Sequence, residues 1–369
     1  MTKRYTPKKL INYLIKEFSL SLFIFFSIFL SLIILSSYIE EIFFFREKQI
    51  SGNLFIKTFI LSLIKTPTLI INMSPFIFLF SGIFFYVKLL RSNEITPLSL
   101  SGFSKNFVTL VPAIYSFLLG VFIILFLTPI SSSLSRYYET VKQNYSKNDN
   151  LLVMSNTGLW VKEKKNNETM IIRADKIIDQ NFKNLNNITI YKFSNNGDLL
   201  QRIDTKKAEV QKNNWVLDNV KILDQDNVNK EEEKINFETS ISLTNLKNFF
   251  SNSDTLSIWN INDEINQIKE LGYYGQELII TLNKYLSLPF LLASMIVLAT
   301  FFTIKTGYQF NNFIYAFLGV LAGIFIYFLS DLSIAIGKSG KMPLIMSVWV
   351  PVLVIMILSI YSIIKEEND

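Results

Sequence analysis

The residue types that most often carry chemistry are sparse in this sequence. Cysteine and histidine are both absent. Without cysteine there is no disulfide framework and no thiolate metal site. Without histidine there is neither an imidazole base nor the commonest zinc ligand. Any catalysis would therefore have to rest on carboxylates, lysine, tyrosine or serine.

Two short stretches imitate the end of a phosphate-binding loop. Residues 337–339 are Gly-Lys-Ser, but the glycine that the loop requires five residues earlier is Leu332. For Gly340-Lys341 that earlier position is Ala335. Both stretches are better explained as a turn between helices, so we expect no cofactor and no ATP site. If the protein takes part in ATP-driven transport, a partner subunit must supply the ATPase.

Asp331 is the one acid inside a long apolar stretch. A carboxylate in hydrocarbon is costly, so such a residue is a functional candidate by default. Its place near one end of the stretch also allows simple hydration, which we weigh as the commoner explanation. A catalytic pair of acids would need a second acid in the apolar stretches, and the sequence has none there. An intramembrane enzyme is therefore poorly supported.

Six apolar stretches are long enough to position such residues in a membrane. Half of the 369 residues are hydrophobic, and the mean hydropathy is +0.32. A bilayer core of about 30 Å needs about 20 apolar helical residues. The predicted spans are Phe18–Tyr38, Phe59–Leu90, Phe107–Ile130, Tyr285–Ile304, Phe313–Ile336 and Pro343–Ile364. A cleavable signal peptide is the alternative for the first stretch, but that stretch is too long and lacks a cleavage site.

Charge predicts the orientation of these spans and isolates the segment between the third and fourth. Residues 131–280 hold 19 basic and 21 acidic residues, and the rest of the chain holds 17 and 9. The basic excess therefore belongs to the membrane part, and we expect no nucleic-acid partner. Five basic residues precede the first span, which by the positive-inside rule places both termini in the cytoplasm and residues 131–280 outside.

The exterior segment has the pattern of short strands. Polar and apolar residues alternate in several runs that Asn, Asp and Gly separate, which is typical of antiparallel β structure. The strands predicted in this way are Met170–Arg173, Ile188–Phe193, Trp215–Leu223 and Ile235–Leu243. We expect Asp254–Leu271 to be helical and Glu231-Glu232-Glu233 to be a solvated turn.

The predicted fold class is thus an α-helical membrane protein with six transmembrane helices and an inserted all-β, jelly-roll-like domain. The predicted domains are an N-terminal helix bundle at 1–130, the β domain at 131–270 and a C-terminal helix bundle at 271–369. A segment at about 89–104 joins the second and third spans on the cytoplasmic side.

Several stretches, taken in order, resemble one family. Arg91-Ser92-Asn93-Glu94-Ile95 followed by Ser101-Gly102-Phe103 resembles the "S-E-L…A-x-G" coupling segment of the LptF/LptG permeases, also called the YjgP/YjgQ family. Asn156–Val161 is similar to the first strand of that family's periplasmic domain, and Leu256–Ile261 to the lead into its fourth span. Residues 319–331 and 342–351 resemble its last two helices. The residues near Trp259 and Trp349 are closer to LptG than to LptF.

The resemblance implies a non-enzymatic permease subunit of a lipopolysaccharide exporter in the bacterial inner membrane. Its implied partners are an LptF-like paralogue, an LptB-like ATPase dimer that binds the ATP, an LptC-like bitopic periplasmic protein and lipopolysaccharide itself. The alternatives are the LptF seat in the same complex, or a membrane-anchored structural protein whose β domain binds a partner without moving lipid.

The resemblance also implies site residues. The segment that docks on the ATPase would use Glu94 with Asn93, Ser92, Arg91 and Gly102, although an ordinary solvated loop acid is the alternative for Glu94. A lateral gate would lie at Ser36–Glu41 and Phe325–Ile336, with its candidates at Ser37, Tyr38, Glu40, Tyr327 and Asp331.

Lipid phosphates require cations at the outer boundary. Arg136 matches a family position of this kind, while an interfacial snorkelling residue is the equal alternative. Predicted depth adds Arg46, Lys48, Lys57 and Lys65. The chain departs from the family where it has Glu139 in place of an arginine, and where no lysine stands near Ser37. These departures put the phosphate contacts in doubt.

Overall fold

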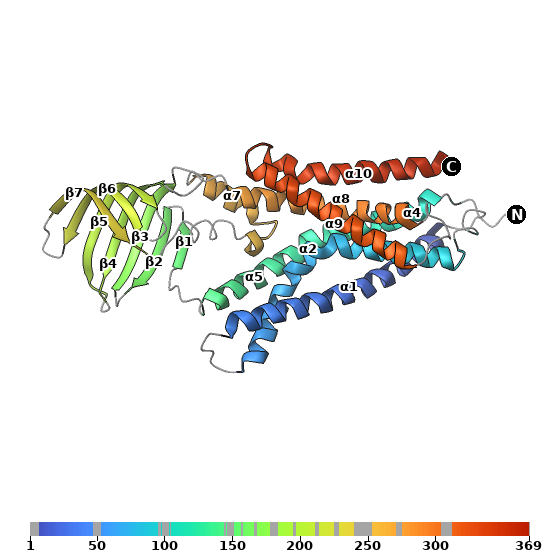
Figure 1. Cartoon of the computed structure of the whole chain (residues 1–369), viewed down its shortest axis with the longest axis horizontal. Coiled ribbons are helices and arrows are strands. Elements are labelled where there is room, and N and C mark those ends of the chain that lie inside the picture. The colour runs from blue at the N-terminus through green and yellow to red at the C-terminus, as the bar shows by residue number, and fades with distance from the viewer. Residues whose placement is uncertain are drawn as a thin grey trace. The chain divides into compact units, whose positions relative to one another are not determined.

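A computed structural model describes most of the chain, shown in Figure 1. Contacts divide the chain into two compact units. The membrane unit comprises Met1–Ser135, Leu256–Ile258 and Ile280–Asp369, and the β unit comprises Arg136–Thr255 and Trp259–Ile279. The described residues are 7–46, 53–94, 97, 103, 105–143, 145, 151–155, 158–165, 168–177, 184–194, 197–210, 214–224, 229–239, 253–270, 275–303 and 312–368.

Among the residues that the structure describes, six helices are long and apolar enough to cross a membrane, which confirms the six predicted spans. Most are longer than predicted because their polar ends remain helical. α1, for example, has 39 residues and is about 58 Å long, well beyond a hydrocarbon core of about 30 Å. The spans are formed by α1 (Pro7–Phe45), α2 (Leu54–Arg91), α4 (Lys105–Phe122) with its continuation, α8 (Gln276–Thr303), α9 (Asn312–Lys338) and α10 (Leu344–Asn368).

The third span contains a π-helical turn. α4 passes without a break into η1 (Ile123–Leu127) and then into α5 (Thr128–Gln143), so the helix continues thirteen residues past its predicted end at Ile130. α5 is polar and amphipathic, which hydropathy cannot detect as part of a span. A π turn accommodates one additional residue in a helix without interrupting it.

Close backbone approaches hold the membrane unit together. α1 and α2 lie side by side over much of their length (Figure 1) and share aromatic contacts such as Phe18–Phe85. Gly319 and Gly323 bring α9 onto α2, where an added Cβ would meet Ile83 and the Phe76 ring. Small residues four apart allow this close packing between helices in a membrane.

Seven described strands form one antiparallel sheet in the β unit, and each pairs with the next in sequence (Figure 1). The inserted all-β domain is therefore confirmed, with a meander connectivity among the described strands. The strands are β1 (Leu151–Ser155), β2 (Gly158–Lys165), β3 (Glu168–Ile177), β4 (Asn184–Phe193), β5 (Leu199–Val210), β6 (Asn214–Asp224) and β7 (Asn229–Glu238).

The sheet curves so that its last strand approaches its early ones. Thr239, directly after β7, donates a side-chain hydrogen bond to the buried carboxylate of Glu163 on β2. The Lys192 ammonium of β4 lies 5.7 Å from the centre of the Phe237 ring of β7. The curved inner face is apolar, and Trp215 and Leu217 are fully buried there. This closure encloses a core within a single sheet.

A transverse row of irregular positions crosses the sheet, and we name it the crease. Pairing passes from Ala174↔Ile188 directly to Lys176↔Asn186, and the same step recurs at the same level in the next three strand pairs. Asn187 and Asn219 have positive φ angles of 48° and 54° there. The residues of the crease are Asp175, Asn187, Lys206, Asn219 and Glu233.

The crease changes the spacing of the buried side chains. Inward residues normally follow at every second position, but across the crease they are three apart, as in Leu217 and Val220. The extra residue in each strand keeps the apolar residues on the same face. The buried Thr205 hydroxyl lies within hydrogen-bond distance of the Lys207 and Asp218 carbonyl oxygens beside the crease, at 2.9 and 2.6 Å.

Two local predictions differ from the structure. Glu231-Glu232-Glu233 lies within strand β7 rather than in a turn, and cross-strand pairing with Lys221 helps to keep it there. The helix predicted over Asp254–Leu271 is interrupted. A short 3-10 turn, η2 (Ser253–Thr255), is followed by a turn at 258–260 and then by α7 (Ile261–Glu270), whose first turn carries Asp263 and Glu264. These acids suit the positive end of the helix dipole, so the helix begins there.

Candidate functional site

The end of α2 fixes the position of Glu94. Asn93 is in the left-handed conformation with φ 54°. Its backbone N–H donates to the Leu90 carbonyl, and the Glu94 N–H donates to the Leu89 carbonyl, both at 3.2 Å. This pair of bonds with a left-handed residue is a Schellman motif, which ends a helix and orients the residue that follows it. Asparagine is one of the few residue types other than glycine that enter this conformation readily.

The carboxylate of Glu94 is also held from the side. The Tyr13 hydroxyl of α1 donates to Glu94 Oε2 at 2.6 Å. Further from this end along the same two helices, Lys88 of α2 forms an ion pair with Glu17 of α1 at 2.6 Å. Both interactions are at least partly exposed. Together they give Glu94 a defined position at an accessible end of the α1–α2 pair.

The other coupling candidates lie around this helix end. Arg91 is the last residue of α2 and is exposed, and the Ser92 hydroxyl donates to the Lys88 carbonyl at 3.0 Å. Gly102 lies outside the described residues. Between Glu94 and α4, only Pro97 and Phe103 are described, and Pro97 is helical.

The candidates for lipid-phosphate contact in the membrane unit differ in how they are held. Arg46 follows α1 and is exposed, while Lys48 lies outside the described residues. Lys57 is on the first turn of α2. Lys65 contacts both carboxylate oxygens of Glu40, at 2.9 and 2.8 Å. The structure therefore joins one predicted cation to one predicted gate acid, and links α1 to α2.

Arg136 belongs to the β unit and is exposed. Its guanidinium donates to the Thr255 carbonyl at 3.1 Å, which joins α5 to the segment before α7. Burial raises the pKa of the nearby Glu264 carboxyl above its ordinary value, and the positive charge of Arg136 opposes that rise. Arg136 thus has a structural partner as well as exposed surface.

The gate candidates all lie on helices that pack on α2. Ser37 is buried, and the ring of Tyr38 packs edge-on against Phe59, with centres 5.9 Å apart. On α9, Tyr327 and Asp331 are one turn apart and share a hydrogen bond. The Tyr327 ring also contacts Phe76 of α2, with centres 6.3 Å apart.

Broad apolar surface remains on the two candidate gate helices. On α1, the side chains of Phe23 and Phe43 are 70% and 67% exposed. On α9, Phe325 and Phe328 are 61% and 59% exposed. Apolar surface on membrane-spanning helices faces lipid or another apolar helix.

Sequence reasoning missed the interactions that set these residues in place. Tyr13 is 81 positions from Glu94, and the Glu17–Lys88 and Glu40–Lys65 pairs also cross between helices. The signal available in the sequence was that these two acids of α1 and these two lysines of α2 are separated by the same number of residues, as two antiparallel helices with paired charges require. Within the described part of the chain, no three Asp or Glu side chains are grouped closely enough to hold a metal ion.

The six spans and the inserted antiparallel sheet define a multi-pass membrane protein with a β domain outside the lipid. The model of one protein family, described as lipopolysaccharide export system permease LptF/LptG, matches residues 12–365. The chain therefore belongs to the LptF/LptG family of inner-membrane permeases. The match does not separate LptF from LptG. Comparison with curated proteins gives no match.

Proposed function

We propose that this chain is the LptG-like permease subunit of an ATP-driven exporter of lipopolysaccharide. It extracts the lipid from the outer leaflet of the inner membrane and passes it through the β domain toward the outer membrane. An LptF-like paralogue completes the channel, an LptB-like ATPase dimer binds the ATP, and an LptC-like protein receives the lipid. Both termini are cytoplasmic and the β domain is periplasmic, in keeping with the basic N-terminal segment.

The observation that carries this proposal is the fixed position of Glu94. A subunit that transmits motion from an ATPase needs a contact residue that cannot move independently of its helices. The Schellman motif and the Tyr13 hydroxyl hold Glu94 on both α2 and α1. Motion applied to Glu94 by the ATPase therefore moves the α1–α2 pair, and α1 carries the gate candidates Ser37, Tyr38 and Glu40.

The proposed lipid site lies along α1 and α9. Exposed aromatic side chains of α1 and α9 supply an apolar wall, which meets the paralogue at the gate with Tyr327 and Asp331. Arg46, Lys48, Lys57 and Arg136 supply charge for lipid phosphates. Lys65 takes this role only if its bond to Glu40 opens, so we assign it to the closed gate.

Reversal of the charge at Glu94 tests the coupling. We expect Glu94→Lys to abolish ATP-driven lipopolysaccharide release from proteoliposomes while the protein still inserts into the membrane. Glu94→Gln keeps an acceptor for Tyr13 and should retain part of the activity. Tyr13→Phe removes the lateral bond and should slow release several-fold.

The measurement is the initial rate of lipopolysaccharide release per ATP hydrolysed, in complexes with the ATPase and both partner subunits. Reversal of an exposed acid outside the coupling end, Asp198→Lys, is the matched control and should leave the rate unchanged. Release at the normal rate by Glu94→Lys would show that Glu94 does not couple the ATPase to the permease. A cross-link from either helix bundle to the LptC-like protein would distinguish the LptG seat from the LptF seat.

A further inference from the structure

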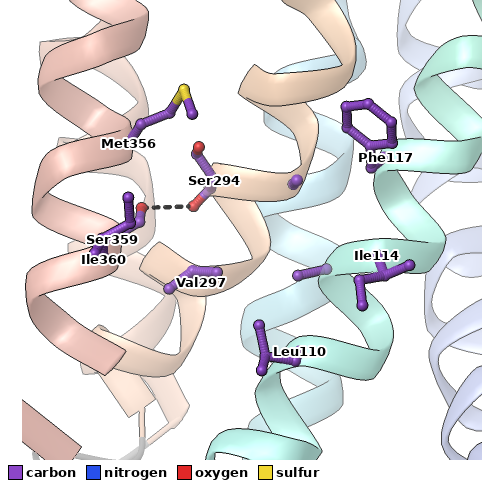
Figure 2. A pocket seen from close by; sticks show the side chains of 10 residues that line it. Leu110, Ile114, Phe117, Ser294, Val297, Met356, Ser359 and Ile360 are labelled. Carbon is purple, nitrogen blue, oxygen red and sulfur yellow. Dashed lines mark hydrogen bonds between the residues drawn. The ribbon is translucent and has the colours of Figure 1, made fainter. Parts of the chain in front are cut away.

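An apolar groove runs between α4, α8 and α10, away from the coupling, phosphate and gate candidates (Figure 2). Its volume is about 250 Å³. Side chains of α4 form one wall, and side chains of α8 and α10 form the other. The lining residues are Leu110, Ala113, Ile114, Phe117, Ala293, Ser294, Val297, Met356, Ser359 and Ile360.

The groove exists because two helices touch at one point and then separate. At Gly120 an added Cβ would lie 2.7 Å from the Pro289 Cα, so α4 and α8 are in backbone contact there. The rings of Phe117 and Phe290 close the same level, with centres 5.2 Å apart. All lining residues of α4 precede this contact and all those of α8 follow it. The groove therefore lies on the Lys105 side of the contact, toward the end of the bundle where α4 begins.

Neither serine in the lining of the groove has a free hydrogen-bond donor to offer an occupant. The Ser359 hydroxyl donates to the Ser294 carbonyl at 3.2 Å, which joins α10 to α8 at the floor (Figure 2). The Ser294 hydroxyl donates to the Phe290 carbonyl of its own helix at 2.8 Å. Both serines are small, and the donor proton of each hydroxyl is used within the protein. The remaining lining side chains are hydrocarbon, aromatic ring or thioether.

Burial divides these side chains into a floor and a rim. Ala113 and Val297 are 5% exposed, whereas Ile114 and Ile360 are 58% and 52% exposed. The three helices are all candidate membrane spans, so the rim opens onto lipid hydrocarbon. A volume of about 250 Å³ lies below the range of roughly 300–1,000 Å³ typical of pockets for whole small molecules. It suits one extended chain rather than a head group or several chains together.

We propose that this groove binds one acyl chain of a membrane phospholipid, with its head group at the level where α4 begins. The first turn of α4 carries no acidic residue, so a head-group phosphate at this level would meet the positive end of the helix dipole with no acid of that turn opposing it. The bound chain fills the space between the N-terminal helix α4 and the C-terminal helices α8 and α10. This lipid would be a structural component, distinct from the exported one.

Photo-cross-linking of the full chain in nanodiscs tests the proposal. The probe is a phosphatidylethanolamine with a diazirine in its acyl chain, in a phosphatidylethanolamine–phosphatidylglycerol bilayer. We expect adducts at Ile114 and Met356 to exceed those at Leu118 and Ile357 at least five-fold, although the latter two side chains are 59% and 64% exposed. Equal labelling at all four positions would show ordinary surface contact and overturn the proposal.

Filling the groove provides the second measurement. Ala113→Leu or Ala293→Leu should reduce groove adducts at least five-fold, and Leu118→Phe on the outer face of α4 should not. If these variants do not fold, native mass spectrometry of the unaltered chain decides, since one phospholipid should remain bound after delipidation. Loss of the groove adducts on addition of unlabelled lipopolysaccharide, or on assembly with the partner subunits, would assign the groove to the substrate or to an interface and refute the proposal.

Discussion

The membrane unit and the β unit both depart from their regular repeat, and they do so differently. In the membrane unit, the third span accommodates a π-helical turn at Ile123–Leu127, and one helix departs alone. In the β unit, the crease passes through β3 to β7 at the same level. A helix satisfies its backbone hydrogen bonds internally, whereas a strand shares them with its neighbours. An additional residue in a strand must therefore be matched in the next strand.

Single-residue deletions should produce the largest difference between the two units. Deleting Asn219 alone puts β6 out of register with β5 and β7 beyond the crease, because the neighbouring strands retain their additional residue. We expect this to remove much of the roughly 5–15 kcal/mol that stabilises a domain, and to unfold the β unit. Deleting Phe126 should convert the π turn to α-helix and leave the membrane unit folded.

Hydrogen exchange read by mass spectrometry on the intact chain measures both deletions. Peptides of β5, β6 and β7 should lose protection in the Asn219 deletion while those of α2 and α8 keep it. The Phe126 deletion should leave both units protected. If both variants lose protection to a similar extent, an additional residue in a helix is as closely matched to its neighbours as one in a strand, and the comparison is wrong.

Substitution within the crease should change the stability of the β unit less than deletion does, and glycine should be tolerated there although it usually destabilises a strand. Asn219 has a φ angle of 54°, so Asn219→Ala should destabilise the β unit by about 1 kcal/mol. Asn219→Gly should be neutral or slightly stabilising because glycine adopts positive φ without strain. At Thr189, a regularly paired position of β4, glycine should instead cost about 1 kcal/mol or more, because it also removes the hydrogen bond from the Thr189 hydroxyl to Asp204 Oδ1 at 2.9 Å.

The denaturant midpoint of the β unit, followed by the fluorescence of its buried tryptophan, checks these three variants. Trp215 is fully buried and reports the inner face of the sheet. If Asn219→Gly destabilises as much as Thr189→Gly does, the positive φ angle at Asn219 is not what the strand requires.

The smallest expected effect is a pH-dependent change in stability, which arises from the different surroundings of one glutamate in each unit. In the membrane unit Glu40 is paired with Lys65, whereas in the β unit burial raises the pKa of Glu264. Because its pKa is raised in the folded state, the folded protein favours the neutral form of Glu264. The stability gained from this neutral form is fully present below the unfolded-state pKa and is lost as the pH rises through the folded-state pKa. Glu264→Gln should therefore raise the melting temperature slightly at pH 8 and not at pH 4. A stability difference that is the same at both pH values would contradict this.

The fold was largely predictable where composition alone decides it. Apolar runs predicted all six spans, and alternation predicted the strands that contain Ile188–Phe193 and Trp215–Leu223. β5 was not predicted, because the crease places Lys206 and Lys207 together and breaks its alternation. The glutamates of β7 were predicted as a turn because cross-strand partners such as Lys221 are invisible in a local window.

The candidate site was predictable only through resemblance. The family pattern pointed to Glu94, but no local pattern pointed to Tyr13, because contact between antiparallel helices depends on how they pack. The same holds for Lys65, which was expected to contact lipid and is bonded to Glu40. Asn93 could have been read as a helix end, since asparagine is common in the left-handed position after a helix.

The ties between α1 and α2 have a mechanical consequence. Tyr13 and Glu17 join the pair at one end, and Glu40 joins it at the other. Tyr13 and Glu40 are 27 positions apart in α1, which corresponds to about 40 Å of helix. Two rods pinned together at both ends resist bending far better than either rod alone. A displacement at one end of the α1–α2 pair would therefore tilt both helices together, and the pair would bend little between its two ends.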